Sequence, residues 1–258
     1  MRFKDKVCVL TGGCSDMGIA VAEKFLKEGA KVVLVDISEE LFEKMDEYKA
    51  EYGDNYRFFL GSVCNYDEME KAMEFTAKEF GTVDILVNMA GMGGRGKIEE
   101  MTLESWNNAI AVTLTGTYHA CRAAVPYMKE KKYGRIINVS SIGGRSNRPV
   151  NVAYAASKAG VNGFSRGLAI ELAPWNITVN TVAPGPLNGG MFTKGAKDPN
   201  YVPSPEMIKA RQMLESTVAM GRLGEMSEIA NGILYLADDE AGWTTGEILD
   251  INGGALMI

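Results

Sequence analysis

Short apolar runs recur along the chain and alternate with longer segments in which apolar residues follow a helical spacing. The short runs are rich in valine, isoleucine and leucine, which indicates buried strands. We predict strands at residues 7–10, 31–35, 56–60, 85–88, 135–139, 178–182 and 245–254, the last including its turn. The longer segments predict helices from the glycine-rich turn at 11–18 to about residue 27, and at 39–52, 67–80, 103–132, 152–173, 204–217 and 226–237.

The order of these elements indicates the fold class. Strands that alternate with helices pair in parallel, and a parallel sheet is covered by helices on both faces. We therefore expect an α/β fold with one doubly wound sheet of about seven strands, which binds its ligands at the carboxyl ends of the strands. The sequence contains no repeat or low-complexity stretch, so residues 1–258 are predicted to form a single domain.

A glycine-rich turn joins the first predicted strand to the first helix. Residues 11–18 have the sequence TGGCSDMG. This is the setting of a dinucleotide site, because glycines let the backbone approach a pyrophosphate and the amides at the start of the helix meet its charge. The second strand ends at Asp36, whose carboxylate is placed to accept hydrogen bonds from the adenosine ribose. The alternative is that Asp36 only caps the helix that begins near Ser38.

Candidate catalytic side chains follow the fifth predicted strand. Ser141 lies just past its carboxyl end, and Tyr154 and Lys158 project together from one face of the helix at 152–173. A tyrosine has a pKa near ~10, and a lysine within reach favours the phenolate and lowers that pKa. The phenol can then exchange a proton with an alcohol or a carbonyl oxygen near neutral pH. Taken alone, a tyrosine and a lysine at this spacing are also a common helical pattern without chemistry.

Together these motifs resemble those of the short-chain dehydrogenase/reductase family. The family pattern TGxxxGxG is matched at Gly12 and Gly18, and the likeness continues through Ser141, Tyr154 and Lys158 to the last predicted strand. The resemblance implies a Rossmann fold, a nicotinamide cofactor and an oxidoreductase. It also implies that Ser141 bonds the substrate oxygen, that Tyr154 is the general acid/base, and that Lys158 lowers the pKa of Tyr154 and bonds the nicotinamide ribose.

The resemblance also implies a set of cofactor contacts. They follow the carboxyl ends of the predicted strands, the glycine turn and the start of the catalytic helix. The expected residues are Gly12, Ser15, Asp16, Met17, Gly18, Asp36, Ile37, Ser62, Val63, Asn88, Ala90, Gly91, Tyr154, Lys158, Pro184, Gly185 and Leu187.

Five positions depart from the family pattern. Asp16 replaces the middle glycine of the turn, where it tolerates left-handed backbone and can cap the helix, but would repel a pyrophosphate unless it points away. Ser62 replaces an aspartate that bonds the adenine, Met89 an asparagine, and Gly189 a threonine that bonds the carboxamide. Thr113 replaces a catalytic asparagine. Its hydroxyl can bond the carbonyl one turn back and bend the helix, or it serves packing alone.

Residues 188–217 are predicted to form a lid over the substrate. The first half of this segment is rich in glycine, proline, lysine and asparagine, a composition typical of a loop, and a short helix follows. Residues 92–96 and 142–151 should complete the substrate pocket. Three arginines in these pocket segments either bind an anionic group of the substrate or are solvated surface residues: Arg95, Arg145 and Arg148.

Composition excludes several classes of function. The chain is 46% hydrophobic and carries a net charge of −6 without a basic cluster, so neither nucleic acid nor a membrane is an expected partner. We find no apolar run of transmembrane length and no signal peptide before the first strand. The four cysteines form no CxxC pair, which indicates a reducing cytoplasm. His119 is the only histidine and we expect it to be structural. No metal-ligand spacing occurs, so we expect no catalytic metal.

We expect an NAD-dependent oxidoreductase that interconverts a secondary alcohol and a ketone. The preference for NAD rests on Asp36, which would repel the 2′-phosphate of NADP and is not followed by lysine or arginine. One alternative is an NADPH-dependent 3-oxoacyl-carrier-protein reductase. Another, of a different class, is a scaffold or sensor that binds NAD without turnover. We also expect a homotetramer, because helices 103–132 and 152–173 have more aliphatic surface than one sheet face covers, and the family pairs through these helices.

Overall fold

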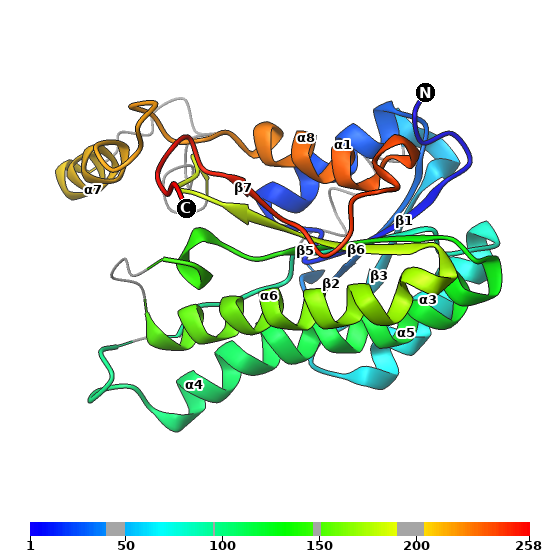
Figure 1. Ribbon diagram of the computed structural model, residues 1–258, viewed down its shortest axis with the longest axis horizontal. Coiled ribbons are helices and arrows are strands. Elements are labelled where there is room, and N and C mark those ends of the chain that lie inside the picture. The colour runs from blue at the N-terminus through cyan, green and yellow to red at the C-terminus, as the bar shows by residue number, and fades with distance from the viewer. Residues whose placement is uncertain (40–49, 95, 147–150, 190–203) are drawn as a thin grey trace.

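Parallel strands form one sheet in the computed structural model, which describes residues 1–39, 50–94, 96–146, 151–189 and 204–258. Within these ranges the sheet has seven strands in the order β3-β2-β1-β4-β5-β6-β7. The strands are β1 Val7–Thr11, β2 Lys31–Asp36, β3 Tyr56–Leu60, β4 Ile85–Asn88, β5 Gly134–Val139, β6 Ile177–Pro184 and β7 Ile248–Ile251. The chain winds outward from β1 in both directions, so the predicted doubly wound α/β sheet is confirmed (Figure 1).

Helices cover both faces of the sheet (Figure 1). One face carries α1 (Asp16–Lys27) and α8 (Met226–Ala237), and the other carries α3 (Tyr66–Phe80), α5 (Gly116–Lys131) and α6 (Val152–Leu172). Successive residues of a strand point to opposite faces. In β1, Cys8 and Leu10 therefore belong to the core under α1 and α8, whereas Val9 belongs to the core under the other three helices. Packing on both faces of the sheet fixes the positions of the carboxyl ends of the strands.

Some elements differ from their predicted bounds. The helix predicted at 103–132 is interrupted, because α4 (Leu103–Ile110) is followed by a π-helical turn, η3 (Ala111–Thr115), before α5 begins. The final strand is shorter than predicted, and α7 (Pro205–Glu215) lies within the predicted 204–217. Of the helix predicted at 39–52, residues 40–49 lie outside the described residues. Short 3-10 turns complete the list: η2 Gly53–Asn55, η4 Ile142–Gly144, η5 Ala173–Trp175 and η7 Asp239–Ala241.

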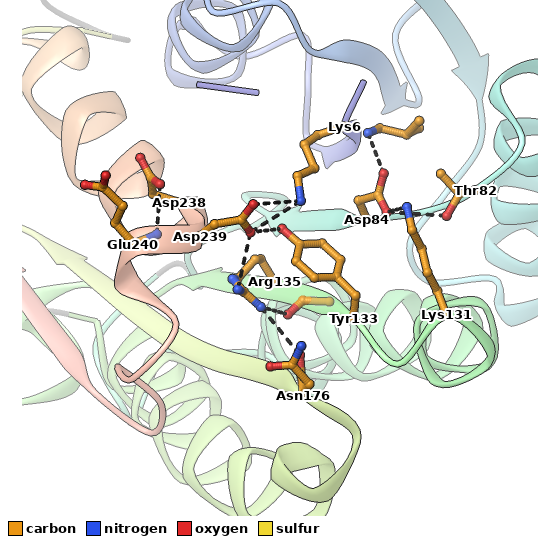
Figure 2. Close-up of polar contacts among 12 residues, drawn as sticks. Lys6, Thr82, Asp84, Lys131, Tyr133, Arg135, Asn176, Asp238, Asp239 and Glu240 are labelled. Atoms are coloured by element: carbon orange, nitrogen blue, oxygen red, sulfur yellow. Dashed lines mark hydrogen bonds and ion pairs between the residues drawn. The ribbon is translucent and has the colours of Figure 1, made fainter. Parts of the chain in front are cut away.

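A network of charged side chains joins the amino ends of the strands (Figure 2). Asp84 precedes β4, is fully buried, and pairs with Lys131 at the end of α5. Asp239 of η7 accepts a hydrogen bond from the Tyr133 hydroxyl at 2.7 Å and pairs with Lys6 at 3.0 Å. The Lys6 ammonium lies 3.8 Å from the centre of the Tyr133 ring, within cation–π distance. The network therefore cross-links the amino ends of the strands, at the opposite end of the sheet from the carboxyl ends.

Candidate active site

The turn after β1 is packed against the segment that follows β4. Gly12 has a φ of +66°, and a Cβ there would lie 2.7 Å from the backbone nitrogen of Ala90. A Cβ on Gly18, in the first turn of α1, would lie 2.4 Å from the carbonyl oxygen of Gly13. Ser15 caps α1, and its hydroxyl accepts a hydrogen bond from the Gly18 amide at 3.1 Å. Only glycine fits at Gly12 and Gly18, so the turn and the start of α1 form the backbone cradle that a pyrophosphate needs.

Asp16 does not cap α1, contrary to one expectation. It is the first residue of the helix, and Ser15 supplies the cap. A Cβ on Gly189 would lie 3.4 Å from Oδ2 of Asp16 and 2.0 Å from Cε of Met226. The carboxylate of Asp16 therefore lies beside Gly189, where the segment after β6 passes the glycine turn. Two of the departures from the family pattern, Asp16 and Gly189, are thus neighbours.

A cavity of about 300 Å³ lies beside the glycine turn at the carboxyl ends of β1 to β4. It is lined by Gly12, Ser15, Val35, Asp36, Ile37, Gly61, Ser62, Val63, Cys64, Met89, Ala90, Gly91, Met92 and Val112. The predicted cofactor contacts Gly12, Ser15, Asp36, Ile37, Ser62, Val63, Ala90 and Gly91 are among these residues. The structure therefore brings together residues from four separate strand ends.

The carboxylate of Asp36 is held in place by three backbone amides. One oxygen accepts a hydrogen bond from the Cys14 amide at 3.0 Å, and the other accepts from the amides of Ile37 at 2.8 Å and Ser38 at 3.2 Å. Asp36 thus caps the turn after β2 and also lines the cavity, so the two roles considered for it are compatible.

Ser62 and Asn88 occupy different depths of the site. Ser62 lines the cavity, and its amide donates to the Glu68 carboxylate at 2.7 Å. Asn88 is only 2% exposed. Its amide group donates to Oδ1 of Asn138 at 2.8 Å and accepts from the Thr11 hydroxyl at 3.2 Å. The side chain of Asn88 therefore cross-links β1, β4 and β5 inside the core, and the small residues after it form the cavity wall.

A second cavity, of about 380 Å³, adjoins the first at the carboxyl ends of β5 and β6. It is lined by Ser15, Asp16, Met17, Met89, Gly91, Val139, Ser140, Ser141, Tyr154, Lys158, Pro184, Gly185, Leu187 and Met226. The two cavities share Ser15, Met89 and Gly91 as walls. An extended ligand can therefore reach from Asp36 in one cavity to Tyr154 in the other.

Ser141 and Tyr154 both line this second cavity and lie on either side of Gly143, where a Cβ would be 3.4 Å from Oγ of Ser141 and 3.3 Å from Cε1 of Tyr154. The hydroxyl oxygen of Ser141 accepts a hydrogen bond from the Gly143 amide at 3.0 Å. Burial raises the pKa of the Tyr154 phenol above its ordinary value, and the hydrogen bond with Ser141 offsets this increase only in part. The expectation that Lys158 lowers the pKa of Tyr154 is therefore wrong for this structure.

Lys158 is buried and directed toward β5. Its side-chain ammonium donates a hydrogen bond to the carbonyl oxygen of Val139 at 2.8 Å and lies 5.8 Å from the centre of the Tyr154 ring. Burial lowers the pKa of Lys158 to about 8. Burial thus disfavours the charged forms of both the phenol and the amine.

Thr113 holds the segment after β4, which lies beside Lys158. Its hydroxyl accepts from the Met92 amide at 3.0 Å and donates to the Met92 carbonyl at 3.2 Å. A hydroxyl has one proton, so the expected bond to the carbonyl one turn back is not made. A Cβ on Gly91 would lie 3.2 Å from the Lys158 nitrogen and 3.6 Å from the Thr113 hydroxyl, so Gly91 separates the two. Thr113 therefore fixes the segment after β4 and does not bond the preceding turn of its own helix.

The predicted substrate pocket is described only in part. Arg145 pairs with Asp250 of β7 and also donates to the carbonyl oxygen of Ile248 at 3.4 Å. It is committed to the sheet edge, so the anion-binding alternative for this residue is wrong. Arg95, Arg148 and residues 190–203 of the predicted lid lie outside the described residues. α7 stands apart from the sheet on the side of the carboxyl ends (Figure 1).

His119 has a structural contact, as expected. Its Nδ1 lies 2.9 Å from the carbonyl oxygen of Val63, on the wall of the first cavity. In the described ranges, no group of three or more histidine, cysteine, aspartate or glutamate side chains is arranged to hold a metal ion. The helices of these same ranges include none with the length and apolar character needed to cross a bilayer.

Met226 begins α8 and lines the second cavity, and it was not among the predicted site residues. Met92 lines the first cavity and lies in the segment 92–96 that was predicted to line the substrate pocket. Asn151, in the predicted segment 142–151, caps α6 and bonds the amide of Tyr154. An asparagine directly before a helical pattern is a capping signal, so this cap was detectable from sequence. Met226 carries no comparable local signal.

Comparisons with known proteins agree with this arrangement over nearly the whole chain. A family model described as Enoyl-(Acyl carrier protein) reductase matches residues 13–255. The chain belongs to the short-chain dehydrogenase/reductase family. It is 36% identical over 257 residues to the 3-oxoacyl-[acyl-carrier-protein] reductase FabG of Thermotoga maritima, with 100% of both chains covered. The family assignment makes the chain an oxidoreductase.

Two further relatives extend this family comparison. The chain is 37% identical to the (2S)-[(R)-hydroxy(phenyl)methyl]succinyl-CoA dehydrogenase subunit BbsD of Thauera aromatica, with 98% of each covered. A solved structure of a variant actinorhodin polyketide ketoreductase with NADPH has a TM-score of 0.88 to this chain, at 30% identity and 97% coverage of each. These two relatives thus match nearly the whole length of this chain, and the ketoreductase shares its fold.

Proposed function

We propose that this oxidoreductase interconverts a secondary alcohol and a ketone with NAD as cofactor. The observation that carries the proposal is the convergence of Ser141, Tyr154 and Lys158 on a cavity that shares its walls with the cavity at Asp36. In this proposal, residues 1–258 form one cofactor-binding and catalytic domain, and residues 188–217 close over the substrate. We also propose that the protein is cytoplasmic. This location is supported by the absence of a disulfide among the four cysteines, all of which lie within the described ranges.

The chain's own residues supply placement and proton transfer. The glycine turn and the start of α1 hold the pyrophosphate, Asp36 holds the adenosine ribose, and Lys158 holds the nicotinamide ribose. When bound, the nicotinamide supplies the hydride chemistry. Ser141 donates a hydrogen bond to the substrate oxygen, and Tyr154 gives that oxygen a proton in reduction or takes one in oxidation. A pKa of about 8 keeps Lys158 largely charged at neutral pH, so its ammonium can donate charged hydrogen bonds to the nicotinamide ribose.

The preference for NAD rests on Asp36. Charged hydrogen bonds to ribose hydroxyls contribute about 1.5–3 kcal/mol each. A 2′-phosphate would replace one donor and place negative charge against the carboxylate, where two unit charges 4 Å apart repel by about 4 kcal/mol at a surface-like dielectric. Among the residues that the structure describes, those that line this cavity include no lysine or arginine to offset the repulsion.

Two other functions compete with this proposal. An NADPH-dependent 3-oxoacyl-carrier-protein reductase is favoured by the name of the Thermotoga maritima relative and by the NADPH in the ketoreductase structure. A catalytically silent NAD-binding scaffold or sensor would have the same glycine turn for the pyrophosphate but would not convert a substrate. The intact set of Ser141, Tyr154 and Lys158 favours an enzyme over the scaffold.

The decisive experiment compares NADH with NADPH on a panel of ketones that includes acetoacetyl-CoA as a 3-oxoacyl thioester, and NAD with NADP on alcohols. We expect kcat/KM to be about tenfold or more higher with NAD(H) than with NADP(H). The Asp36→Ala variant should show a smaller difference between the two cofactors, mainly because it binds NADH more weakly. Asp54→Ala, an exposed aspartate of η2, is the matched control. Equal or better use of NADPH would overturn the role of Asp36 and favour the carrier-protein reductase. Binding of NADH without any turnover would favour the scaffold.

A further inference from the structure

One side chain, Asn151, joins the start of the catalytic helix to the glycine-rich segment after β4. Asn151 is the N-cap of α6, and its Oδ1 accepts hydrogen bonds from the amides of Ala153 at 3.0 Å and Tyr154 at 3.3 Å. Its Nδ2 donates to the carbonyl oxygen of Gly96 at 3.0 Å. The two ends of a single amide group thus connect the backbone of Tyr154 to a segment 55 residues earlier in the chain.

The glycines of this segment make the contact possible. A Cβ on Gly94 would lie 2.5 Å from Oδ1 of Asn151 and 2.9 Å from Cβ of Ala153, so a larger residue would push the segment away. Gly96 has a φ of +81°, in the left-handed region that favours glycine. A Cβ on Gly93 would lie 3.9 Å from the ring of Tyr154. The segment therefore passes directly beside the phenol on its way to Asn151.

The other end of the segment is held by Thr113. Both backbone groups of Met92 bond the Thr113 hydroxyl, in the π-helical turn between α4 and α5. The segment is thus fixed at Met92 by Thr113 and at Gly96 by Asn151, with the ring of Tyr154 beside the span between them. α4 and α6 begin at the same end of the molecule, where this segment lies (Figure 1).

We propose that Asn151 is a positioning residue for the reaction at Tyr154. Its acceptor oxygen fixes the backbone of Tyr154, and its donor nitrogen holds Gly96, next to the wall formed by residues 91–94, of which Gly91 lines both cavities and Gly93 lies beside the Tyr154 ring. The inference rests on the proposed function, because the wall matters for catalysis only if a substrate oxygen binds at Tyr154. The link itself is a property of the fold and can be tested without a substrate.

The two functions of the amide group can be separated by substitution. Asn151→Asp keeps an acceptor for the Ala153 and Tyr154 amides, and a carboxylate is favourable at a helix N-terminus. It loses the donor and places an oxygen against the Gly96 carbonyl, so it should release the segment and leave α6 capped. Asn151→Ala removes both contacts. Thr102→Ala is the matched control, because Thr102 caps α4 through the Ser105 amide at 3.1 Å.

Hydrogen exchange measured by mass spectrometry tests the link. In Asn151→Asp, peptides that cover residues 91–96 should exchange about tenfold faster than in the unmodified protein, with the start of α6 unchanged. In Asn151→Ala both regions should exchange faster, and in Thr102→Ala the increase should be confined to α4. Unchanged exchange at 91–96 in Asn151→Asp would overturn the inference, whether or not the protein turns over any ketone.

Steady-state kinetics with the best ketone of the panel test the positioning role. In Asn151→Asp, KM for the ketone should rise about fivefold or more while kcat stays within about twofold, since the wall is loosened but Tyr154 remains capped. In Asn151→Ala, kcat should also fall, because the backbone of Tyr154 is released. Faster exchange with an unchanged KM would overturn the positioning role. A protein that uses no ketone would contradict the proposed function, and hydrogen exchange would still decide the link.

Discussion

At the scale of single residues, burial sets the protonation of the two candidate catalytic groups. Burial raises the pKa of Tyr154 and lowers the pKa of Lys158 to about 8. A protonated phenol is the form that reduction of a ketone requires, whereas oxidation of an alcohol requires the phenolate. Oxidation should therefore gain rate as pH rises above neutrality, and reduction should not.

The first prediction concerns Tyr154. Tyr154→Phe keeps the ring and its packing beside Gly93 and Gly143 but removes the hydroxyl proposed to transfer the proton. We expect turnover to fall about 10²-fold or more, with NADH affinity retained, as measured by steady-state rates and fluorescence titration. Tyr118→Phe, at an exposed tyrosine of α5, should keep full turnover. A Tyr154→Phe protein with near-native turnover would show that another group carries the proton.

Sequence motifs located most of the candidate site but not its electrostatics. The positions of Ser141, Tyr154 and Asp36 relative to strand ends follow from the order of elements, because parallel strands bring their carboxyl ends together. The direction of the Tyr154 pKa shift depends on burial, which is set by packing from distant parts of the chain. The commitment of Arg145 to Asp250, 105 residues away, was likewise invisible to local patterns.

At the scale of elements, periodicity predicted the sheet well and the helix breaks poorly. Each predicted strand in the described ranges exists, because buried parallel strands produce short apolar runs, and the length of a run and its flanking turn residues distinguish it from a helix. The π-helical turn at Ala111–Thr115 was missed. Its central residue, Thr113, bonds Met92, which lies 21 residues earlier, so no local signal marks it.

The second prediction tests that turn. Thr113→Val preserves shape but leaves the Met92 amide and carbonyl without their partner in a buried place, which costs about 1–3 kcal/mol of unfolding free energy. Because the freed segment also borders Lys158, turnover should fall in parallel. Urea unfolding and steady-state rates measure the two effects. Thr76→Val, which removes a buried hydroxyl from α3 far from the cavities, should lower stability alone. Unchanged kinetics in Thr113→Val would assign Thr113 to packing.

At the scale of the whole molecule, the two ends of the parallel strands carry different features. The carboxyl ends carry the cavities, and the amino ends carry the charged network around Tyr133 (Figure 2). Burial alone would raise the pKa of Asp239, but hydrogen bonds from Tyr133 and Lys6 outweigh it, so the pKa of Asp239 is lowered. A carboxylate with a lowered pKa stabilises the fold above its unfolded pKa and loses this contribution as pH falls.

The third prediction follows from this linkage. Asp239→Asn should be less stable than the unmodified protein at pH 7, and it should lose less stability on acidification below about pH 4, where aspartates of the unfolded chain become protonated. Urea unfolding at a series of pH values measures both effects. Asp54→Asn, at an exposed position of η2, should reproduce the unmodified curve. Parallel curves for the Asp239→Asn variant and the unmodified protein would contradict the role of Asp239.

The fourth prediction is a symmetric oligomer, which we propose to be a homotetramer. Ile170 of α6 is 80% exposed, and Leu103 of α4 and Tyr118 of α5 are also exposed. The rings of Tyr118 and Phe164 meet edge to face at 6.3 Å, so α5 and α6 present one continuous surface. An apolar surface of this kind marks an interaction site, and a stable pair of copies buries about 800 Å² on each partner.

Ile170→Glu tests whether this surface is the interface. A charge on this surface would be desolvated on assembly, so light scattering should show a smaller species whose thermal unfolding, followed by circular dichroism, remains cooperative. Leu60→Glu is the control, at an exposed leucine of the edge strand β3. This variant should leave the oligomer intact. A monomeric unmodified protein at micromolar concentration would refute the oligomer. An oligomer that survives Ile170→Glu unchanged would move the interface to another face of the molecule.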